Sequence, residues 1–341
     1  MLNLILTITP LAPYQIFLVC LGVVVGLLVL WQAVCLIIAR YILHTACTPV
    51  RHTFQDVRQR QTSVEHVDYT DYDVNWNKRP FEIEGLRGKL RGEAVFNPNA
   101  GAVNGRQKVA VICHGHTMNR LNSLKYAEIF YNAGYNVVIY DHAYFGESEG
   151  KFCTLGYYER VDLSIVIDYV RKVFGADCFL ALHGESMGAV TVLSVLGLRS
   201  DVDLVVADCP FSDTEGYYRE LFEHLFHLPS RPIVDYCASM AKTYYSYDFS
   251  KCRPIEDVKG SDVPICFIHG KADDFIFPHH SEDMYAVCRN SLSEIHLFDG
   301  AGHARSHLTD KALYTRTVTG FLDKVERVAA DVQSTATRDT M

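Results

Sequence analysis

The chain has 341 residues, of which 49% are hydrophobic, 21% charged and 12% aromatic. This apolar content suffices for one large or two small folded domains and excludes wholesale disorder. The formal net charge is −8, from 32 Lys and Arg against 40 Asp and Glu. Such a balance excludes nucleic acid as the main partner, because duplex binding requires a positive surface.

The first strong feature is an apolar run at residues 16–39, which follows a short N-terminal tail at 1–15. About 24 residues at about 1.5 Å each extend for about 36 Å, enough to cross a hydrocarbon core of about 30 Å. A cleaved signal peptide fits less well, because the first basic residue, Arg40, follows the run instead of preceding it. A buried core helix also fits less well, since the run is apolar on all sides. We therefore predict a single transmembrane helix.

The flanking charges of this helix predict its orientation. Nothing basic precedes it, whereas Arg40, Arg51, Arg58 and Arg60 follow. Basic flanks stay on the cytoplasmic side, so we expect the rest of the chain to be cytoplasmic at the cell membrane. The eleven cysteines include no CxxC pair and no repeated spacing. This pattern fits a reducing compartment and disfavours structural zinc.

The middle of the chain has the alternating rhythm of a mostly parallel sheet covered by helices. Residues 40–79 are polar and irregular, which predicts a juxtamembrane linker that can include a first helix, and residues 81–96 alternate as in a β-hairpin. Apolar residues with helical spacing predict a helix over 157–174. Near-continuous apolar runs alternating with amphipathic helices indicate strands buried on both faces. These runs are 108–115, 135–141, 178–184, 203–209, 263–270 and 294–298.

Two segments depart from this rhythm. Residues 211–253 are rich in Tyr and Phe and follow a predicted strand, so we expect a helical insertion beside the usual ligand crevice of such sheets. Extra helical packing is the simpler interpretation of the same aromatic residues. The polar end of the chain, residues 329–341, is predicted to be a disordered tail.

The strongest chemical motif is Gly184-Glu185-Ser186-Met187-Gly188, which matches G-x-S-x-G. It follows an apolar strand and precedes a helix-compatible run, which is the context of a nucleophile elbow. The glycines are required because larger residues at the two ends of the turn would clash with the adjoining strand and helix. We therefore predict that Ser186 is a nucleophile, with an ordinary helix N-cap as the alternative.

A serine nucleophile needs a base, and His303 is the candidate. It follows the last predicted strand in the glycine-containing segment Asp299-Gly300-Ala301-Gly302-His303. His183 directly precedes the elbow, but it belongs to a buried strand. His303 is therefore preferred as the general base.

The base in turn needs an acid that fixes its tautomer and stabilises the imidazolium. Asp273 lies just beyond the strand at 263–270, and Asp274 and Asp208 are rivals, Asp208 because it ends an earlier strand. The chain order Ser186, Asp273, His303 is the order of α/β-hydrolase triads. We therefore prefer Asp273.

An oxyanion hole requires two backbone N–H donors. Met187 follows the nucleophile and should supply one, and His116, in the loop after the first long strand, should supply the other. His114 and His116 could instead bind a metal as H-x-H, but the sequence indicates no third ligand. The segment from Asp141 to Ser148 resembles a turn with a structural role.

These motifs together resemble the α/β-hydrolase superfamily, of the serine esterase, lipase and acyl-hydrolase type, over about residues 80–328. The resemblance implies a mostly parallel sheet with helices on both faces, a helical lid over about 211–253, and a Ser186–His303–Asp273 triad without cofactor or metal. The chain is similar to membrane-anchored bacterial members. It departs from the family at His142, where many relatives carry Arg. The residues that carry the resemblance are His114-Gly115, Asp141 to Ser148, Gly184 to Gly188, His269 to Asp273, and Gly302-His303.

The resemblance leaves the substrate open. An aromatic lid beside a membrane anchor favours an apolar acyl ester or lipid. A serine peptidase or thioesterase on the same fold is the alternative, and a non-catalytic membrane-bound binding protein is a further one. Ser186 at the elbow excludes the branches of the superfamily that use Asp as the nucleophile. The oligomeric state does not follow from the sequence.

Overall fold

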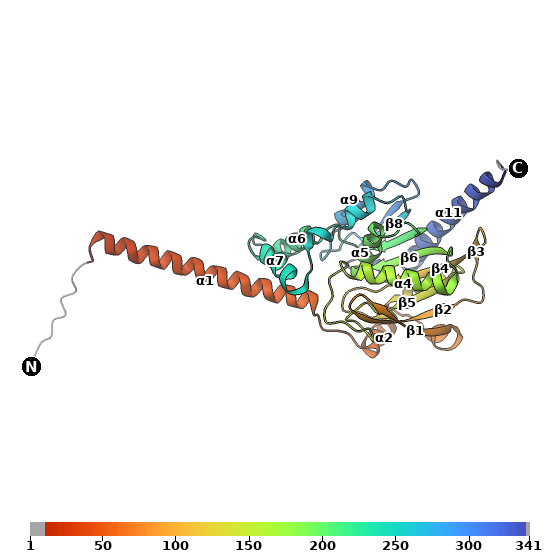
Figure 1. Cartoon of the computed structure of the whole chain (residues 1–341), viewed down its shortest axis with the longest axis horizontal. Helices are drawn as coiled ribbons and strands as arrows, with labels where there is room; N and C mark the ends of the chain where they lie inside the picture. The colour runs from red at the N-terminus through yellow and green to blue at the C-terminus, as the bar shows by residue number, and fades with distance from the viewer. Residues whose placement is uncertain (1–10, 339–341) are drawn as a thin grey trace, which may run out of the picture.

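The computed structural model of the chain describes residues 11–338 and is built around one nine-stranded sheet (Figure 1). The strand order is β1-β2-β5-β4-β6-β7-β8-β9, and the short β3 pairs with β4. Strands β1, β2 and β5 are antiparallel neighbours, and all pairs from β5 to β9 are parallel. The strands are β1 (Asn77–Gly85), β2 (Gly88–Phe96), β3 (Ala102–Val103), β4 (Arg106–Cys113), β5 (Asn136–Tyr140), β6 (Phe179–Glu185), β7 (Leu204–Asp208), β8 (Ile265–Gly270) and β9 (Glu294–Phe298).

The six strands predicted after the hairpin are all present, and so is the hairpin itself as β1 and β2. The central strands β4 to β8 form because each is buried on both faces. In β4, Val109 and Val111 pack in one core while Ala110 and Ile112 pack in the other. Side chains alternate across a strand, so a continuous apolar run can only be satisfied between two layers of helices.

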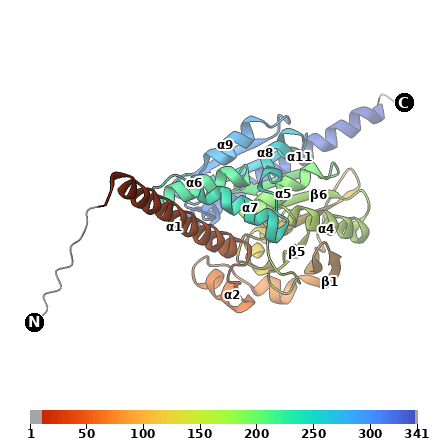
Figure 2. The same ribbon diagram turned by 60° about the vertical axis from the view of Figure 1, so that its left-hand side comes forward.

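Helices supply those two layers (Figure 2). One core lies between the sheet and α2 (Phe54–Ser63), α3 (Leu124–Asn132) and α11 (Lys311–Arg338). The other lies between the sheet and α4 (Glu159–Phe174), α5 (Met187–Ser194), α8 (Pro254–Lys259) and α9 (His279–Ala286). Helix α4 forms within the range predicted for it. The short helix α10 (Ser306–Thr309) precedes α11.

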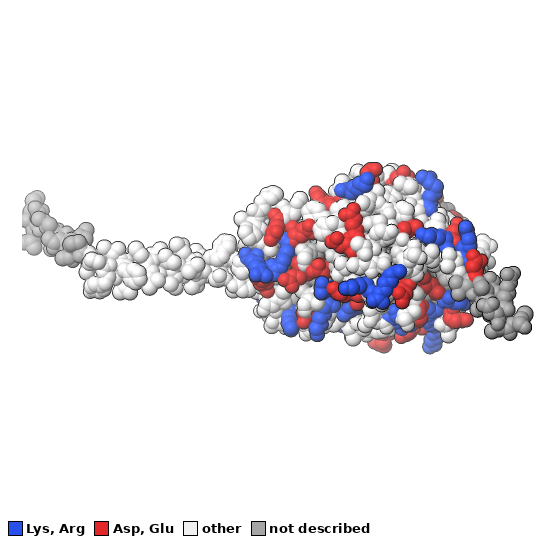
Figure 3. Space-filling model, turned by 90° about the horizontal axis from the view of Figure 1, so that it is seen from above, with Lys and Arg blue, Asp and Glu red and all other residues white. Residues whose placement is uncertain are grey.

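The N-terminal helix α1 (Pro13–Cys47) is longer than the predicted span of 16–39 at both ends. Its side chains are exposed up to Val34, and its C-terminal part packs on α7 (Ile233–Tyr245). Figure 3 shows the exposed part as a stalk without charged residues, beside a domain that carries both signs. Among the described residues, α1 is the one helix long and apolar enough to cross a membrane. Its buried residues recur every four positions, at Cys35, Ala39, Leu43 and Cys47.

Much of the segment 40–79, expected to be a juxtamembrane linker that can include a first helix, packs onto the domain. Helix α1 continues to Cys47, α2 follows, and a single π-helical turn spans Asp71–Asn75. Val57 and Trp76 are buried in the same core as α3. The segment reads as polar because its apolar side chains are sparse, yet Val57, Val67 and Trp76 are buried in the core, whereas Val50 and Val74 are exposed.

The aromatic insertion at 211–253 is helical, with α6 (Thr214–Phe226) and α7 packed beside the end of α1 (Figures 1 and 2). We call α6, α7 and the turn between them the lid. The predicted disordered tail at 329–341 is wrong for 329–338, because α11 continues to Arg338. The apolar side of α11 extends to Ala329, which gives the helix a packed base to continue from. Residues 339–341, and residues 1–10 of the predicted N-terminal tail, lie outside the described part of the chain.

Candidate active site

Ser186 sits at a strained turn between β6 and α5. Its φ of 54° and ψ of −116° lie in a region that residues other than Gly rarely adopt, at a cost of about 1–3 kcal/mol. The turn closes tightly around it. A Cβ on Gly184 would lie 2.2 Å from the backbone of Gly188, and one on Gly188 would lie 2.2 Å from the carbonyl oxygen of Cys113. The predicted reason for both glycines is therefore visible in the structure.

Ser186, His303 and Asp273 form one hydrogen-bonded chain. The Ser186 hydroxyl lies 3.0 Å from His303 Nε2, and His303 Nδ1 lies 2.8 Å from Asp273 Oδ2. Because a carboxylate only accepts, Nδ1 donates to Asp273 and the lone pair of Nε2 faces the serine. The imidazole is thus held in the tautomer in which Nε2 can take a proton.

The Asp273 carboxylate is buried and fixed at both oxygens. Oδ1 accepts from the backbone N–H groups of Phe275 at 3.0 Å and Ile276 at 2.9 Å. Oδ2 lies 3.3 Å from His269 Nε2, in addition to its bond from His303. Burial raises the pKa of Asp273, but the bonds from His269 and His303 lower it more, so the net pKa is well below its usual range. This side chain therefore stays ionised beside the imidazole.

The rival acids are placed differently. Asp274 is exposed, whereas Asp208 is buried, with its carboxyl near Tyr126 and Tyr314. Burial and the nearby Glu185 carboxylate raise the pKa of Asp208 to about 7. Neither geometry orients an imidazole as Asp273 does. His183, the other candidate base, is buried and bonded to Tyr314 at 2.9 Å.

The two residues predicted to supply oxyanion donors both border the same cavity as Ser186. Met187 is the first residue of α5, so its N–H is one of the groups at a helix start that have no partner within the helix. His116 follows β4, and its side chain Nε2 lies 2.9 Å from the carbonyl oxygen of Ala46 at the end of α1. A carbonyl only accepts, so this Nε2 donates.

His114 and His116, the two residues of the alternative metal site, have different hydrogen-bond partners. His114 Nε2 accepts from the backbone N–H of His142 at 3.0 Å, while His116 bonds to α1. Burial lowers the pKa of His114 to about 4, so its ring stays neutral. The His114 ring thus holds the loop after β5, and the His116 ring holds the end of α1.

The turn from Asp141 to Ser148 has the structural role expected for it. Asp141 is buried and accepts from the backbone N–H groups of Arg120 at 2.7 Å and Glu147 at 3.0 Å. The Ser148 hydroxyl donates to the backbone carbonyl of Asp141 at 2.6 Å. These bonds fix the loop after β5 to the segment that follows β4.

Sequence reasoning missed a buried ionic network beneath the elbow. Glu185, the residue before Ser186, contacts Lys125 Nζ at 2.9 Å, Tyr126 Oη at 2.5 Å and Asn122 Nδ2 at 2.9 Å. Burial raises the pKa of Glu185, but Lys125 and these bonds lower it more, to about 2. The sequence signal was available in part, because a charged residue inside a buried turn requires a partner. Its partners lie on α3 and the turn before it, about 60 positions away, and no local pattern identifies them.

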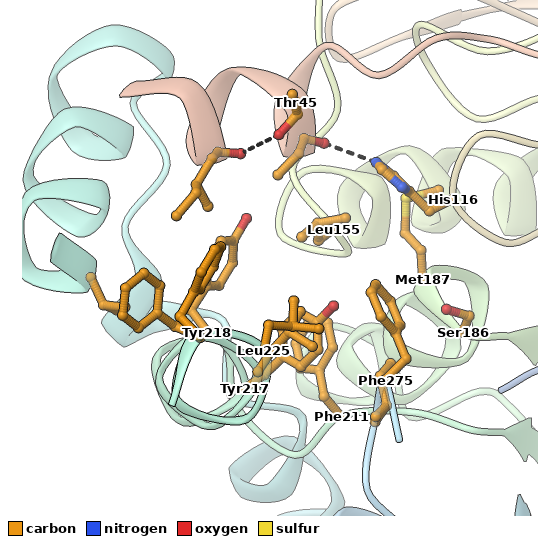
Figure 4. A pocket seen from close by; sticks show the side chains of 17 residues that line it. Thr45, His116, Leu155, Ser186, Met187, Phe211, Tyr217, Tyr218, Leu225 and Phe275 are labelled. Atoms are coloured by element: carbon orange, nitrogen blue, oxygen red, sulfur yellow. Dashed lines mark hydrogen bonds between the residues drawn. The ribbon is translucent and has the colours of Figure 1, made fainter. Parts of the chain in front are cut away.

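A cavity of about 300 Å³ leads away from Ser186. Figure 4 shows Ser186 and Met187 at one end, with Tyr217, Tyr218 and Leu225 of the lid facing the end of α1 across the cavity. Among the described residues, those that line it include no Asp, Glu, Lys or Arg. Sequence reasoning also missed that α1 lines part of this cavity, through Ile42, Thr45 and Ala46.

Comparison with known proteins places this geometry in a family. Residues 105–248 match the family described as serine aminopeptidase, S33. The uncharacterized protein YqkD of Bacillus subtilis (strain 168) is 33% identical over 280 residues, covering 81% of this chain and 88% of YqkD. The protein YfhR of Escherichia coli (strain K12) is 24% identical over 232 residues, covering 66% of this chain and 73% of YfhR.

Solved structures show the same fold. The esterase Pf2001 of Pyrococcus furiosus superposes with a TM-score of 0.59 at 22% identity, covering 76% of this chain and 96% of that one. Est1E of Butyrivibrio proteoclasticus, solved with ferulic acid bound, gives 0.55 at 20% identity, covering 72% and 98%. The fold predicted from the sequence is therefore confirmed. The chain is a member of the α/β-hydrolase superfamily, in the same family as YqkD.

Proposed function

We propose that the protein is a membrane-anchored serine hydrolase that cleaves carboxylic esters with apolar acyl groups. The observation that carries this proposal is the chain of bonds from Ser186 through His303 to Asp273 at the end of an uncharged cavity. An ordinary serine is a poor nucleophile, and this arrangement supplies both the base and the group that orients it.

The reaction follows from these positions. His303 Nε2 takes the hydroxyl proton while Ser186 Oγ attacks the ester carbonyl carbon. The negative oxygen that develops is held by the backbone N–H groups of Met187 and His116. His303 then gives its proton to the leaving alcohol, and an acyl-enzyme remains. Water attacks the acyl carbon, His303 takes a proton from that water, and the carboxylic acid leaves as Ser186 regains its proton.

The cavity lining favours an ester over an aminopeptidase substrate, the activity named in the family description. Binding the ammonium of a peptide N-terminus calls for a carboxylate, because a buried charge needs a partner. The lining residues supply none. Aromatic and aliphatic side chains of the lid instead fit an alkyl chain.

A fluorophosphonate probe tests the nucleophile directly. Wild-type membranes should be labelled, and Ser186→Ala should abolish labelling. The surface variant Ser200→Ala is the matched control and should label like wild type. Turnover of p-nitrophenyl butyrate should follow the same pattern and exceed turnover of aminoacyl nitroanilides. Equal labelling of wild type and Ser186→Ala would contradict the proposal.

The anchor is α1, with the hydrolase domain on the cytoplasmic side. Arg40, Arg51, Arg58 and Arg60 all lie on the domain side of its exposed apolar part. All eleven cysteines are free, which suits a reducing compartment. Ser200→Cys should react with a membrane-impermeant maleimide in inverted vesicles and not in right-side-out vesicles. The opposite labelling would reverse the orientation.

A further inference from the structure

The anchor helix is also a wall of the cavity. Ile42, Thr45 and Ala46, near its C-terminal end, border the same space as Ser186 (Figure 4). The Ala46 carbonyl also accepts from the side chain of His116, which lies beside the nucleophile. A helix that only tethered the domain would contact neither the cavity nor this loop.

The far end of the cavity opens at the tip of the lid. Leu225 and Phe226, at the end of α6, line the cavity and are nevertheless 57% and 51% exposed. Leu228, in the turn that follows, is 54% exposed. Exposed apolar side chains at the mouth of an apolar cavity indicate a site that meets another apolar phase.

The packing of α7 on α1 shows which way this mouth faces. The Tyr236 hydroxyl bonds to Gln32, and the Arg40 guanidinium lies 5.9 Å from the ring centre of Tyr244. From the first contact to the second, the chain moves forward by eight residues on α1 and by eight residues on α7. The two helices therefore run parallel to each other. The turn before α7, which forms the lid tip, therefore lies toward the N-terminal, exposed part of α1.

The exposed part of α1 is long enough to cross a bilayer. From Pro13 to Trp31 there are about 19 residues, which at about 1.5 Å each give about 28 Å, close to a hydrocarbon core of about 30 Å. Aromatic residues are favoured at the membrane interface, so we place the membrane surface at Trp31. Gln32 and its partner on α7 lie at the same level. With this placement the lid tip lies at the membrane surface, and the exposed Arg231 lies at headgroup level.

We propose that the substrate is an acyl ester resident in the membrane, which enters from the bilayer between the lid tip and α1. The acyl chain lies along the wall formed by Ile42 and Ala46, and the ester reaches Ser186. This inference rests on the proposed serine hydrolase function. It adds the substrate class and the path, and it makes α1 a determinant of acyl-chain specificity.

Full-length protein in phosphatidylcholine vesicles tests the wall. The ratio of p-nitrophenyl palmitate to p-nitrophenyl acetate turnover should fall about tenfold or more in Ile42→Trp, because the larger ring fills space that the long chain needs. Ile37→Trp is the matched control. Ile37 lies on the same helix, is 68% exposed and is not among the residues that line the cavity, so its ratio should equal that of wild type.

A second pair of variants tests the path without changing the cavity. Leu228→Asp should lower turnover of vesicle-borne palmitate relative to water-soluble butyrate by about tenfold, because a charge at the tip disfavours contact with the acyl region. Leu198→Asp replaces a residue of similar exposure, 49%, in the segment that follows α5, and should behave as wild type. Fluorophosphonate labelling of each variant reports whether Ser186 is still assembled.

The outcomes separate the two proposals. Wild-type turnover with unchanged ratios in both Ile42→Trp and Leu228→Asp would overturn the membrane path and leave the serine hydrolase intact. Wild-type protein without labelling or ester turnover would overturn the hydrolase function, and this inference with it. Falls in both ratios, with both controls unchanged, are the expected result.

Discussion

Replacing Asp273 by Asn is the sharpest test of how the site works, because the structure dictates how the amide must sit. The backbone N–H groups of Phe275 and Ile276 both point at the Oδ1 position. An amide NH₂ there would oppose two donors, so the amide oxygen must occupy it. The NH₂ group is then forced to face His303, whose Nδ1 must become an acceptor. His303 Nε2 consequently carries a proton and can no longer take one from Ser186.

The expected loss is about 10³–10⁴ in kcat, or about 4–5.5 kcal/mol of transition-state stabilisation. The KM for p-nitrophenyl butyrate should change little, since Asp273 is buried behind His303 and is not among the residues that line the cavity. Asp274→Asn, at the exposed neighbouring position, is the matched control and should retain wild-type kcat. Steady-state hydrolysis and the rate of fluorophosphonate labelling measure both variants. Retention of a tenth or more of kcat in Asp273→Asn, with a thousandfold loss in Asp208→Asn, would refute the reasoning.

Three further predictions concern the support of the elbow, and thermal unfolding of the full chain in detergent measures each. Gly188→Ala should cost about 3 kcal/mol, because its Cβ would lie 2.2 Å from the carbonyl oxygen at the end of β4. Gly320→Ala, which meets nothing within 4 Å in α11, should not destabilise, and equal effects would contradict this account. Lys125→Met should cost about 3–5 kcal/mol by leaving Glu185 buried without its cation, and an unchanged Tm would show that the pair is dispensable. Asp208 has its pKa raised to about 7 in the folded chain, so the contribution of this one group to stability falls as pH rises from about 4 to about 7, and Asp208→Asn should gain up to about 4 kcal/mol relative to wild type across that window. A constant difference between the two proteins at all pH values would contradict this assignment.

Much of the fold could be predicted because its signals are local. Each central strand is a continuous apolar run, and β4 to β9 lie where those runs are. The elbow is equally local, since Ser186 and the two glycines that allow its turn lie within five consecutive positions. The N-terminal boundary of the folded domain could not be predicted in the same way. The sparse apolar residues of 40–79 give no periodic signal, although Val57 and Trp76 reach the core.

The site divides in the same way. The sequence by itself determined the apolar character of α1, the alternation of strands and helices, and a serine at a tight turn, because each depends on residues that are neighbours along the chain. It also placed His303 and Asp273 at strand ends that a parallel sheet brings to one edge. Only the tertiary structure decided that Lys125 neutralises Glu185 and that the end of α1 walls the cavity. Those contacts join segments about 60 or more positions apart, and their geometry exists only once the sheet has brought the segments together.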